Sequence, residues 1–148
     1  MITFHAEPPG GAPGPPRHAD SLVDGLLDAP LFQGVQREEV VGVLSDFDEE
    51  SFNTGHRITL QGFRGSDFFI VVDGRARVLI DGEAVATLER GDFFGEVAVI
   101  AGLPRTATVV AETPLRCLVL PHRALEELLK QHPQMSVNLL RGVLQRLS

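Results

Sequence analysis

Apolar residues recur at helical spacing near both ends of the chain. One such stretch runs from Ser21 until Pro30 interrupts it, and a second covers residues 36–47 with charged side chains on its other face. Near the C-terminus, Pro121 and Pro133 each stand where a helix is expected to begin. The last helix carries an apolar stripe, which consists of Leu140, Val143, Leu144 and Leu147. The pattern therefore predicts helices at both ends.

The middle of the chain, from about His56, has the pattern of strands. Val, Ile, Phe and Thr are frequent there, and glycines interrupt them at short intervals. The predicted strands occupy residues 67–72, 75–80, 83–88, 106–112 and 115–120. Asp73-Gly74 and Asp81-Gly82 separate the first three strands, and Asp-Gly pairs suit the positive φ angles of type I′ turns. Both pairs thus predict hairpins, and the three strands predict an antiparallel meander.

Short strands, glycine turns and terminal helices together predict the fold class. We expect an α+β fold that is mainly β, an antiparallel β-roll or jelly-roll-like barrel flanked by N- and C-terminal helices. Residues 1–20 hold five of the ten prolines and have little to bury. They predict a disordered or extended leader, so the domain itself is expected over residues 21–148.

Charge and composition exclude several classes of function. The 148 residues include 13 Lys and Arg against 20 Asp and Glu, a formal net charge of −7, so no basic surface for a phosphate backbone is expected. The last predicted helix leaves no room for a helix-turn-helix, so we expect no DNA binding by this chain alone. The single cysteine, Cys117, cannot form an internal disulfide and is expected in the core, and five scattered histidines suggest no metal site.

The sequence also lacks the marks of a membrane protein or an enzyme. It contains no signal peptide pattern and no apolar run near the roughly 18 residues that cross a bilayer, so a cytoplasmic protein without membrane contact is expected. It contains no nucleophile beside a base, no pair of catalytic carboxylates and no Walker-type loop. We therefore expect neither catalysis nor a cofactor.

Residues 94–109 carry the most informative chemistry. They read FGEVAVIAGLPRTATV and lie between two predicted strands. Gly91 and Gly95 permit tight turns, and the residues that follow have room for about one helical turn, whose first amides suit an anion. Nine residues after Glu96, Arg105 offers a guanidinium that can hold a phosphate through two parallel hydrogen bonds. A cavity faced by one carboxylate and one guanidinium suits a ligand with sugar hydroxyls and a phosphate, which favours a nucleotide.

This segment resembles the phosphate-binding cassette of the cyclic nucleotide-binding domain family. The frame around it is similar as well, because residues 62–67 read GFRGSD, residues 68–74 read FFIVVDG and residues 91–96 read GDFFGE. The resemblance covers about residues 21–148. It implies that Glu96 accepts the ribose 2′-hydroxyl and that Arg105 pairs with the cyclic phosphate. It also implies that further residues surround the ligand, namely Phe94, Gly95, Val97, Ala98, Thr106 and Ala107.

The same resemblance suggests which residues contact the base. It places Val85 and Ala86 under the purine. In channel-type members of the family an arginine of the last helix covers the ligand, and Arg146 stands at the corresponding position. Its guanidinium would stack on or hydrogen-bond the base, with Val143 and Leu147 as apolar cover.

Several interpretations stay open on the sequence alone. The first choice is a regulatory or sensor domain that binds cyclic AMP (cAMP), with Thr106 also permitting cyclic GMP (cGMP), and that moves its C-terminal helices on binding. The alternatives are the sensor part of a transcription regulator without its helix-turn-helix, a module of a channel, transporter or kinase, and an interaction domain that has lost its ligand. Glu96 and Arg105 could also form an ordinary ion pair that closes a turn. The apolar stripe on the last helix predicts a homodimer or a protein partner.

Overall fold

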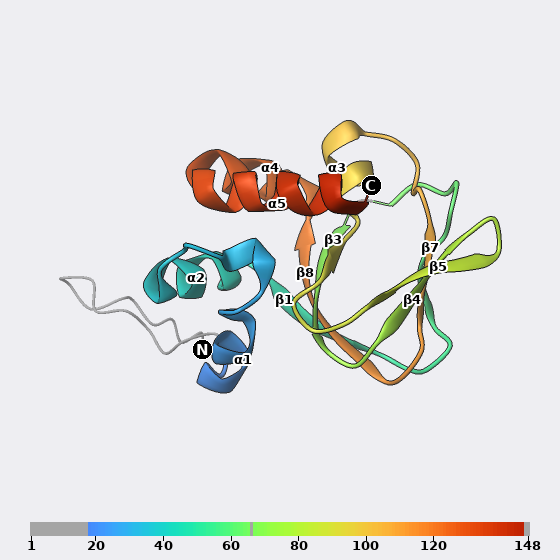
Figure 1. Cartoon of the computed structure of the whole chain (residues 1–148), viewed down its shortest axis with the longest axis horizontal. Helices are drawn as coiled ribbons and strands as arrows, with labels where there is room; N and C mark the ends of the chain where they lie inside the picture. Colours follow the sequence, from blue (N-terminus) through green and yellow to red (C-terminus); the bar gives the residue numbers. More distant parts are fainter. Residues whose placement is uncertain (1–17, 66, 147–148) are drawn as a thin grey trace, which may run out of the picture.

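The computed structural model describes residues 18–65 and 67–146, and its strands belong to a small antiparallel barrel (Figure 1). The strands are β1 (Asp48–Phe52), β2 (Arg57–Thr59), β3 (Asp67–Asp73), β4 (Ala76–Ile80), β5 (Glu83–Leu88), β6 (Phe93–Phe94), β7 (Thr108–Ala111) and β8 (Leu115–Pro121). Within the described residues they form two four-stranded sheets, with strand orders β1-β8-β3-β6 and β2-β7-β4-β5.

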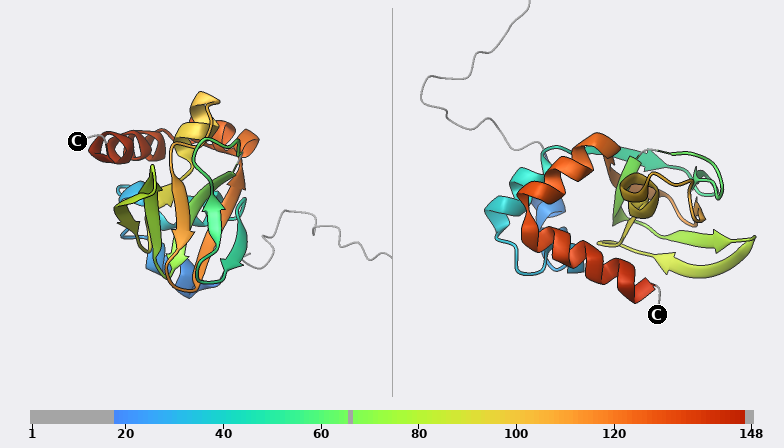
Figure 2. Two further views of the ribbon diagram at one scale, coloured as in Figure 1. Left: turned by 90° about the vertical axis from the view of Figure 1, so that its right-hand side faces the viewer. Right: turned by 90° about the horizontal axis from the view of Figure 1, so that it is seen from above.

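Helices precede and follow the strands along the chain. They are α1 (Asp20–Leu26), the 3₁₀ helix η1 (Pro30–Phe32), α2 (Arg37–Leu44), α3 (Glu96–Ala101), α4 (His122–Gln131) and α5 (Pro133–Arg146). Helices α1, α2, α4 and α5 lie on the side of the sheet that contains β1, β3 and β8, and α5 ends next to α3 (Figures 1 and 2). The predicted α+β fold, an antiparallel β-roll flanked by N- and C-terminal helices, is confirmed. No helix in the described ranges is long and apolar enough to cross a membrane.

Two hydrophobic clusters stabilise the fold, and β3 contributes to both. Phe68, Ile70 and Val72 belong to a cluster shared with the helices. Phe69 and Val71 point the other way, into a second cluster between the two sheets. Because both faces of β3 are covered, the strand reads as an unbroken apolar run and not as an alternating one. This strand therefore connects the helical layer to the interior of the barrel.

The second predicted hairpin is confirmed and leads into one wall of the barrel. β4 and β5 pair antiparallel, with Ile80 opposite Glu83. Asp81 and Gly82 between them have φ angles of 52° and 83°, as a type I′ turn requires. This turn therefore follows directly from its two residues.

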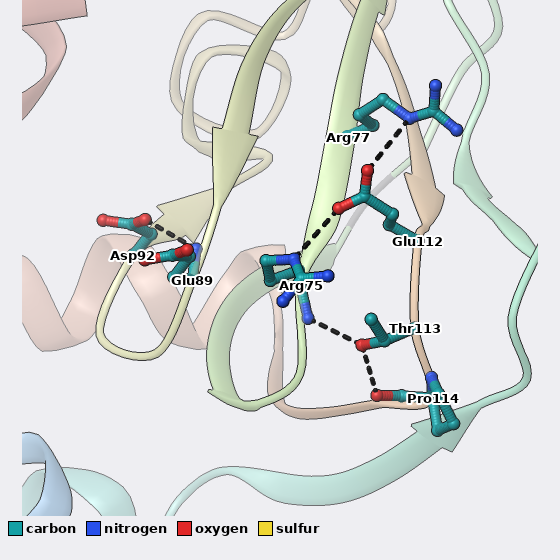
Figure 3. A network of polar contacts seen from close by, with 7 residues as sticks. All are labelled: Arg75, Arg77, Glu89, Asp92, Glu112, Thr113 and Pro114. Atoms are coloured by element: carbon teal, nitrogen blue, oxygen red, sulfur yellow. Dashed lines mark hydrogen bonds and ion pairs between the residues drawn. The ribbon is translucent and has the colours of Figure 1, made fainter.

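The hairpin predicted at Asp73-Gly74 is wrong, and with it the meander. β3 and β4 belong to different sheets, so the chain crosses between the sheets at this point. The β7–β8 connection crosses beside it, where Thr113 Oγ1 accepts a hydrogen bond from the Arg75 amide at 2.9 Å and donates one to Pro114 O at 3.0 Å (Figure 3). A Cβ on Gly74, whose φ is 89°, would collide with Pro114 O. Glycine is needed here because the β3–β4 and β7–β8 connections pass close to each other, and not because the chain makes a hairpin turn.

The first strand, β1, has no counterpart among the predicted strands. It pairs antiparallel with β8 along its whole length. Its sequence DEESF is polar, and only Phe52 is partly buried while the other residues are exposed. An edge strand whose side chains face water leaves no apolar alternation for a sequence pattern to detect.

The described chain begins within the predicted leader. His18 is buried, and its Nε2 lies 2.8 Å from the carbonyl oxygen of Leu44 at the end of α2. α1 begins at Asp20, one residue before the domain start expected at Ser21. Residues 1–17 of the predicted leader lie outside the described residues.

The face that helix α5 buries in the domain is largely separate from its apolar stripe. Its buried residues are Met135, Asn138 and Leu139. Of the predicted stripe, Val143 is partly buried against the core, whereas Leu140 and Leu144 are 56% and 53% exposed. Leu147 lies outside the described residues. The stripe therefore faces largely away from the barrel, and the dimer expected from it stays a prediction.

Candidate functional site

A pocket of about 540 Å³ lies between the sheet β2-β7-β4-β5, the chain from β6 into α3, and the end of α5. Ten of the eleven residues predicted for the site line it. These are Val85, Ala86, Phe94, Gly95, Glu96, Ala98, Arg105, Thr106, Ala107 and Arg146. The eleventh, Val97, belongs to the first turn of α3, and its side chain lies outside the described part. The structure thus gathers residues that are up to 61 positions apart in the sequence, from Val85 to Arg146.

Arg105 is held in place from the loop between α3 and β7. Only 7% of the residue is exposed. Its Nη1 donates to Gly95 O at 3.1 Å and its Nη2 to Asp67 O at 2.9 Å. Gly65 packs directly against the guanidinium, since a Cβ there would lie 2.7 Å from Nη2 and 2.8 Å from Cζ. The side chain is therefore held by the backbone oxygens of Gly95, before α3, and of Asp67, at the start of β3.

The electrostatic surroundings of Arg105 keep a cation in a poorly hydrated place. Burial lowers the pKa of its guanidinium, and the negative charges of Asp67 and Glu96 oppose that effect. An arginine stays protonated even with a lowered pKa. The pocket therefore presents a fixed positive charge.

Glu96 supplies the opposite charge. It is the first residue of α3, and 4% of it is exposed. Gly95 before it has a φ of 92°, a left-handed conformation that turns the chain sharply from β6 into the helix. Within the described chain the carboxylate is paired with Arg146 and not with Arg105, so the alternative of an ordinary Glu96–Arg105 ion pair finds no support.

Arg146 reaches the pocket from the last turn of α5. Its Nη1 donates to Glu96 Oε1 at 2.9 Å, and its Nη2 makes a short hydrogen bond to Phe93 O. Its Cζ lies 4.4 Å from the centroid of the Phe93 ring. Figure 1 accordingly shows the end of α5 beside α3. From the sequence we expect Arg146 to contact the base. Its three contacts with Glu96 and Phe93 are not predictable from the sequence.

The remaining walls of the pocket are mostly apolar. Sequence reasoning missed Thr59, Val78, Ile80, Leu88 and Val109, which also line it. Val78 and Ile80 are two residues apart on β4 and therefore share one face of that strand. This spacing could have identified them as pocket residues only if the strands that pair with β4 were known. Thr59 Oγ1 donates to Ala107 O at 3.0 Å and so ties β2 to the cassette. An apolar wall of this kind suits the flat ring of a base.

No cluster of three or more His, Cys, Asp or Glu side chains that could hold a metal ion occurs among the residues whose placement is described. The charged side chains that line the pocket are one carboxylate and two guanidinium groups, on Glu96, Arg105 and Arg146.

Comparison with known proteins identifies the family of this chain. The model of the cyclic nucleotide-binding domain matches residues 49–132, more than half of the chain. The cAMP-dependent protein kinase regulatory subunit of Mycosarcoma maydis is 36% identical over 113 residues, which cover 70% of this chain and 22% of that protein. The chain spans 22% to 30% of the length of the kinase regulatory subunits that it matches.

Solved structures resemble the whole fold. The catabolite activator protein of Thermus thermophilus superposes with a TM-score of 0.74 at 30% identity, covering 80% of this chain and 58% of that one. The regulatory domain of Toxoplasma gondii PKA, solved with cAMP, gives a TM-score of 0.70 at 25% identity and covers 83% of this chain and 49% of that one. The kinase relatives are regulatory subunits, in agreement with the expectation of a regulatory domain and not an enzyme. With the family model matching more than half of its length, this chain belongs to the cyclic nucleotide-binding domain family.

Proposed function

We propose that this chain binds a cyclic nucleotide in the pocket described above, with cAMP as the first choice. The observation that carries the proposal is the pair Arg105 and Glu96. They are 7% and 4% exposed, carry opposite charges, and line one pocket without bonding to each other. Glu96 is paired with Arg146, whereas Arg105 bonds two carbonyl oxygens and no carboxylate among the described residues. A buried cation without a bonded anion favours a ligand that brings one, and the Glu96 carboxylate can accept hydrogen bonds from hydroxyl groups of the same ligand.

Arg105 is the proposed partner of the cyclic phosphate. A guanidinium has five N–H groups, and the bonds to Gly95 O and Asp67 O engage two of them among the described residues. Both bonds hold the planar fork in one orientation, which reduces the conformational entropy that a ligand must remove. Thr106 and Ala107 follow directly on the pocket wall, and the amides of Val97 and Ala98 in α3 complete the proposed phosphate contacts.

Glu96 is the proposed acceptor for the ribose 2′-hydroxyl, and the base would lie against the apolar wall with Val85 and Ala86 beneath it. Thr106 is exposed at the pocket and offers a hydroxyl that suits guanine as well, so cGMP remains the second candidate ligand.

The proposed output of the domain is a movement of α5. Val143 and Arg146 belong to this helix and line the pocket, so a ligand there contacts the helix directly. Binding shifts the position of α5 only as far as the ligand prefers one position over another, which is typically a coupling of about 1–3 kcal/mol.

The context of the domain is proposed from its relatives. The matches favour a regulatory subunit or the sensor part of a transcription regulator. A cytoplasmic location and the absence of DNA contact by this chain stay predictions from its sequence. The exposed residues Leu140 and Leu144 on α5 are the proposed contact for a second copy or a protein partner.

Calorimetric titration with cAMP and cGMP tests the proposal, using the wild type, Arg105→Ala and the exposed control Arg57→Ala. Removing one partner of a buried, hydrogen-bonded charge pair weakens binding by about 2–5 kcal/mol, or roughly 30- to 4,000-fold. We expect that loss for Arg105→Ala and unchanged affinity for Arg57→Ala. Equal affinities of the two variants, or a wild type that binds neither nucleotide, would contradict the proposal, and the second result would favour an interaction domain.

A further inference from the structure

We propose that Arg146 acts by positioning Glu96 for the ribose and not by covering the base. The inference rests on the proposed function, because it names how one of the pocket's charged groups is prepared for that ligand. Its starting point is a set of contacts that hold the guanidinium of Arg146 on protein groups.

Three contacts hold this guanidinium. One terminal nitrogen bonds Glu96 Oε1 at 2.9 Å, the other bonds the backbone oxygen of Phe93, and the plane of the group lies over the Phe93 ring with Cζ 4.4 Å from its centroid. To reach a purine, Arg146 would have to break two charged hydrogen bonds and a cation–π contact. Each of these is stronger than a neutral hydrogen bond or an ordinary van der Waals contact.

The Phe93 ring beneath the guanidinium of Arg146 is packed into the core. Phe93 is 5% exposed, and its ring centroid lies 5.8 Å from that of Phe68 in the core. One helical turn before Arg146, a Cβ on Gly142 would lie 2.7 Å from Cζ of Phe93, so the backbone of α5 rests on the ring. Residues four apart share one face of a helix, and Gly142 therefore fixes where Arg146 meets β6 and α3.

The consequence falls on the carboxylate of Glu96. It is 4% exposed and uses Oε1 for Arg146. Glu96 also lines the pocket, and the proposal assigns its second oxygen, Oε2, to the ribose hydroxyl. Arg146 thus balances the charge of the carboxylate and holds it in one orientation. Without Arg146, Glu96 would lose both its countercharge and its orientation.

The test pairs variants with a ligand that lacks the hydroxyl in question. Affinities for cAMP and 2′-deoxy-cAMP are measured for the wild type, Arg146→Ala, Arg146→Lys and the exposed control Arg141→Ala on the same helix, after circular dichroism has verified folding. We expect Arg146→Ala to weaken cAMP by about 10- to 100-fold, as for loss of a charged hydrogen bond, and to change 2′-deoxy-cAMP by less than about twofold. Arg146→Lys keeps the countercharge and should recover part of the loss, and Arg141→Ala should change nothing.

A second arm uses Glu96→Gln. If Arg146 acts through Glu96, adding Arg146→Ala to Glu96→Gln should cause no further loss for cAMP. Equal losses for cAMP and 2′-deoxy-cAMP would overturn the inference and assign Arg146 to the base, and no loss for either ligand would also overturn it. A wild type that binds neither ligand would overturn the proposed function instead, so the two failures are distinguishable.

Discussion

Replacing Gly65 by alanine should weaken nucleotide binding and leave the fold intact. A Cβ at this position would lie 2.7 Å from Nη2 and 2.8 Å from Cζ of Arg105, and closer still to Nε, so the guanidinium has to move. The φ angle of Gly65 lies outside the left-handed region and the residue is exposed, so alanine fits its backbone. Because the displaced atoms are the far end of a flexible side chain, the strain is relieved by moving Arg105 and not by unfolding.

The size of the effect follows from what Arg105 would lose. Moving the fork breaks its alignment with Gly95 O and Asp67 O and with an incoming phosphate. Loss of one hydrogen bond to a charged group corresponds to about 1.5–3 kcal/mol, or roughly 10- to 150-fold in affinity. Urea unfolding should still show one cooperative transition, with the free energy of unfolding lowered by about 1.5–3 kcal/mol, because the bonds of Arg105 to Gly95 O and Asp67 O also stabilise the fold.

Calorimetry with cAMP and urea unfolding, done side by side on Gly65→Ala and Gly42→Ala, provide the assay. Gly42 also has a compatible φ angle, and nothing lies within 4 Å of the place that a Cβ would take there, so its substitution controls for the loss of a glycine. Wild-type affinity in Gly65→Ala would refute the reasoning that Arg105 needs this space.

Two further predictions concern the scaffold. Asn138 Nδ2 donates to Leu31 O at 2.9 Å and to Gln33 O at 2.8 Å, so Asn138→Ala should lower the free energy of unfolding by roughly 1–3 kcal/mol for each carbonyl group that loses its donor. Urea unfolding measures this change, and a loss below about 0.5 kcal/mol would mean that these bonds do not anchor α5. Burial, with a smaller effect of Glu50, raises the pKa of Cys117 to about 12, so the native thiol should react with Ellman's reagent at about pH 8 far more slowly than the urea-unfolded chain, and equal rates would contradict the burial of this strand.

Much of the fold could be predicted because its signals are local. Pro121 and Pro133 mark the starts of α4 and α5, and Asp81-Gly82 specifies its own turn. Asp73-Gly74 has the same two residue types, yet the hairpin predicted there is wrong. The sheet to which a strand belongs depends on its pairing partners, and those of β3 and β4 are distant in sequence. Strand β1 was missed since its pairing with β8 involves backbone groups under exposed, polar side chains.

The site divides in the same way. Glu96 and Arg105 lie in one continuous motif, and the structure brings both to the pocket. The partners of Arg105 are backbone oxygens of Gly95 and Asp67, which no side-chain pattern reveals. Arg146 was identified as a candidate, whereas its contacts with Glu96 and Phe93 depend on how closely α5 approaches β6 at Gly142.

The most direct test of the central claim is a titration of the ¹⁵N-labelled chain with cAMP, followed by two-dimensional NMR of the backbone amides. Binding in the pocket predicts saturable shifts concentrated at Gly95, Ala98, Arg105 and Ala107, and little change at the exposed Leu140 of α5 beyond that caused by helix movement. Unchanged spectra at millimolar cAMP, or shifts confined to residues outside the pocket, would contradict the claim that this chain binds a cyclic nucleotide there.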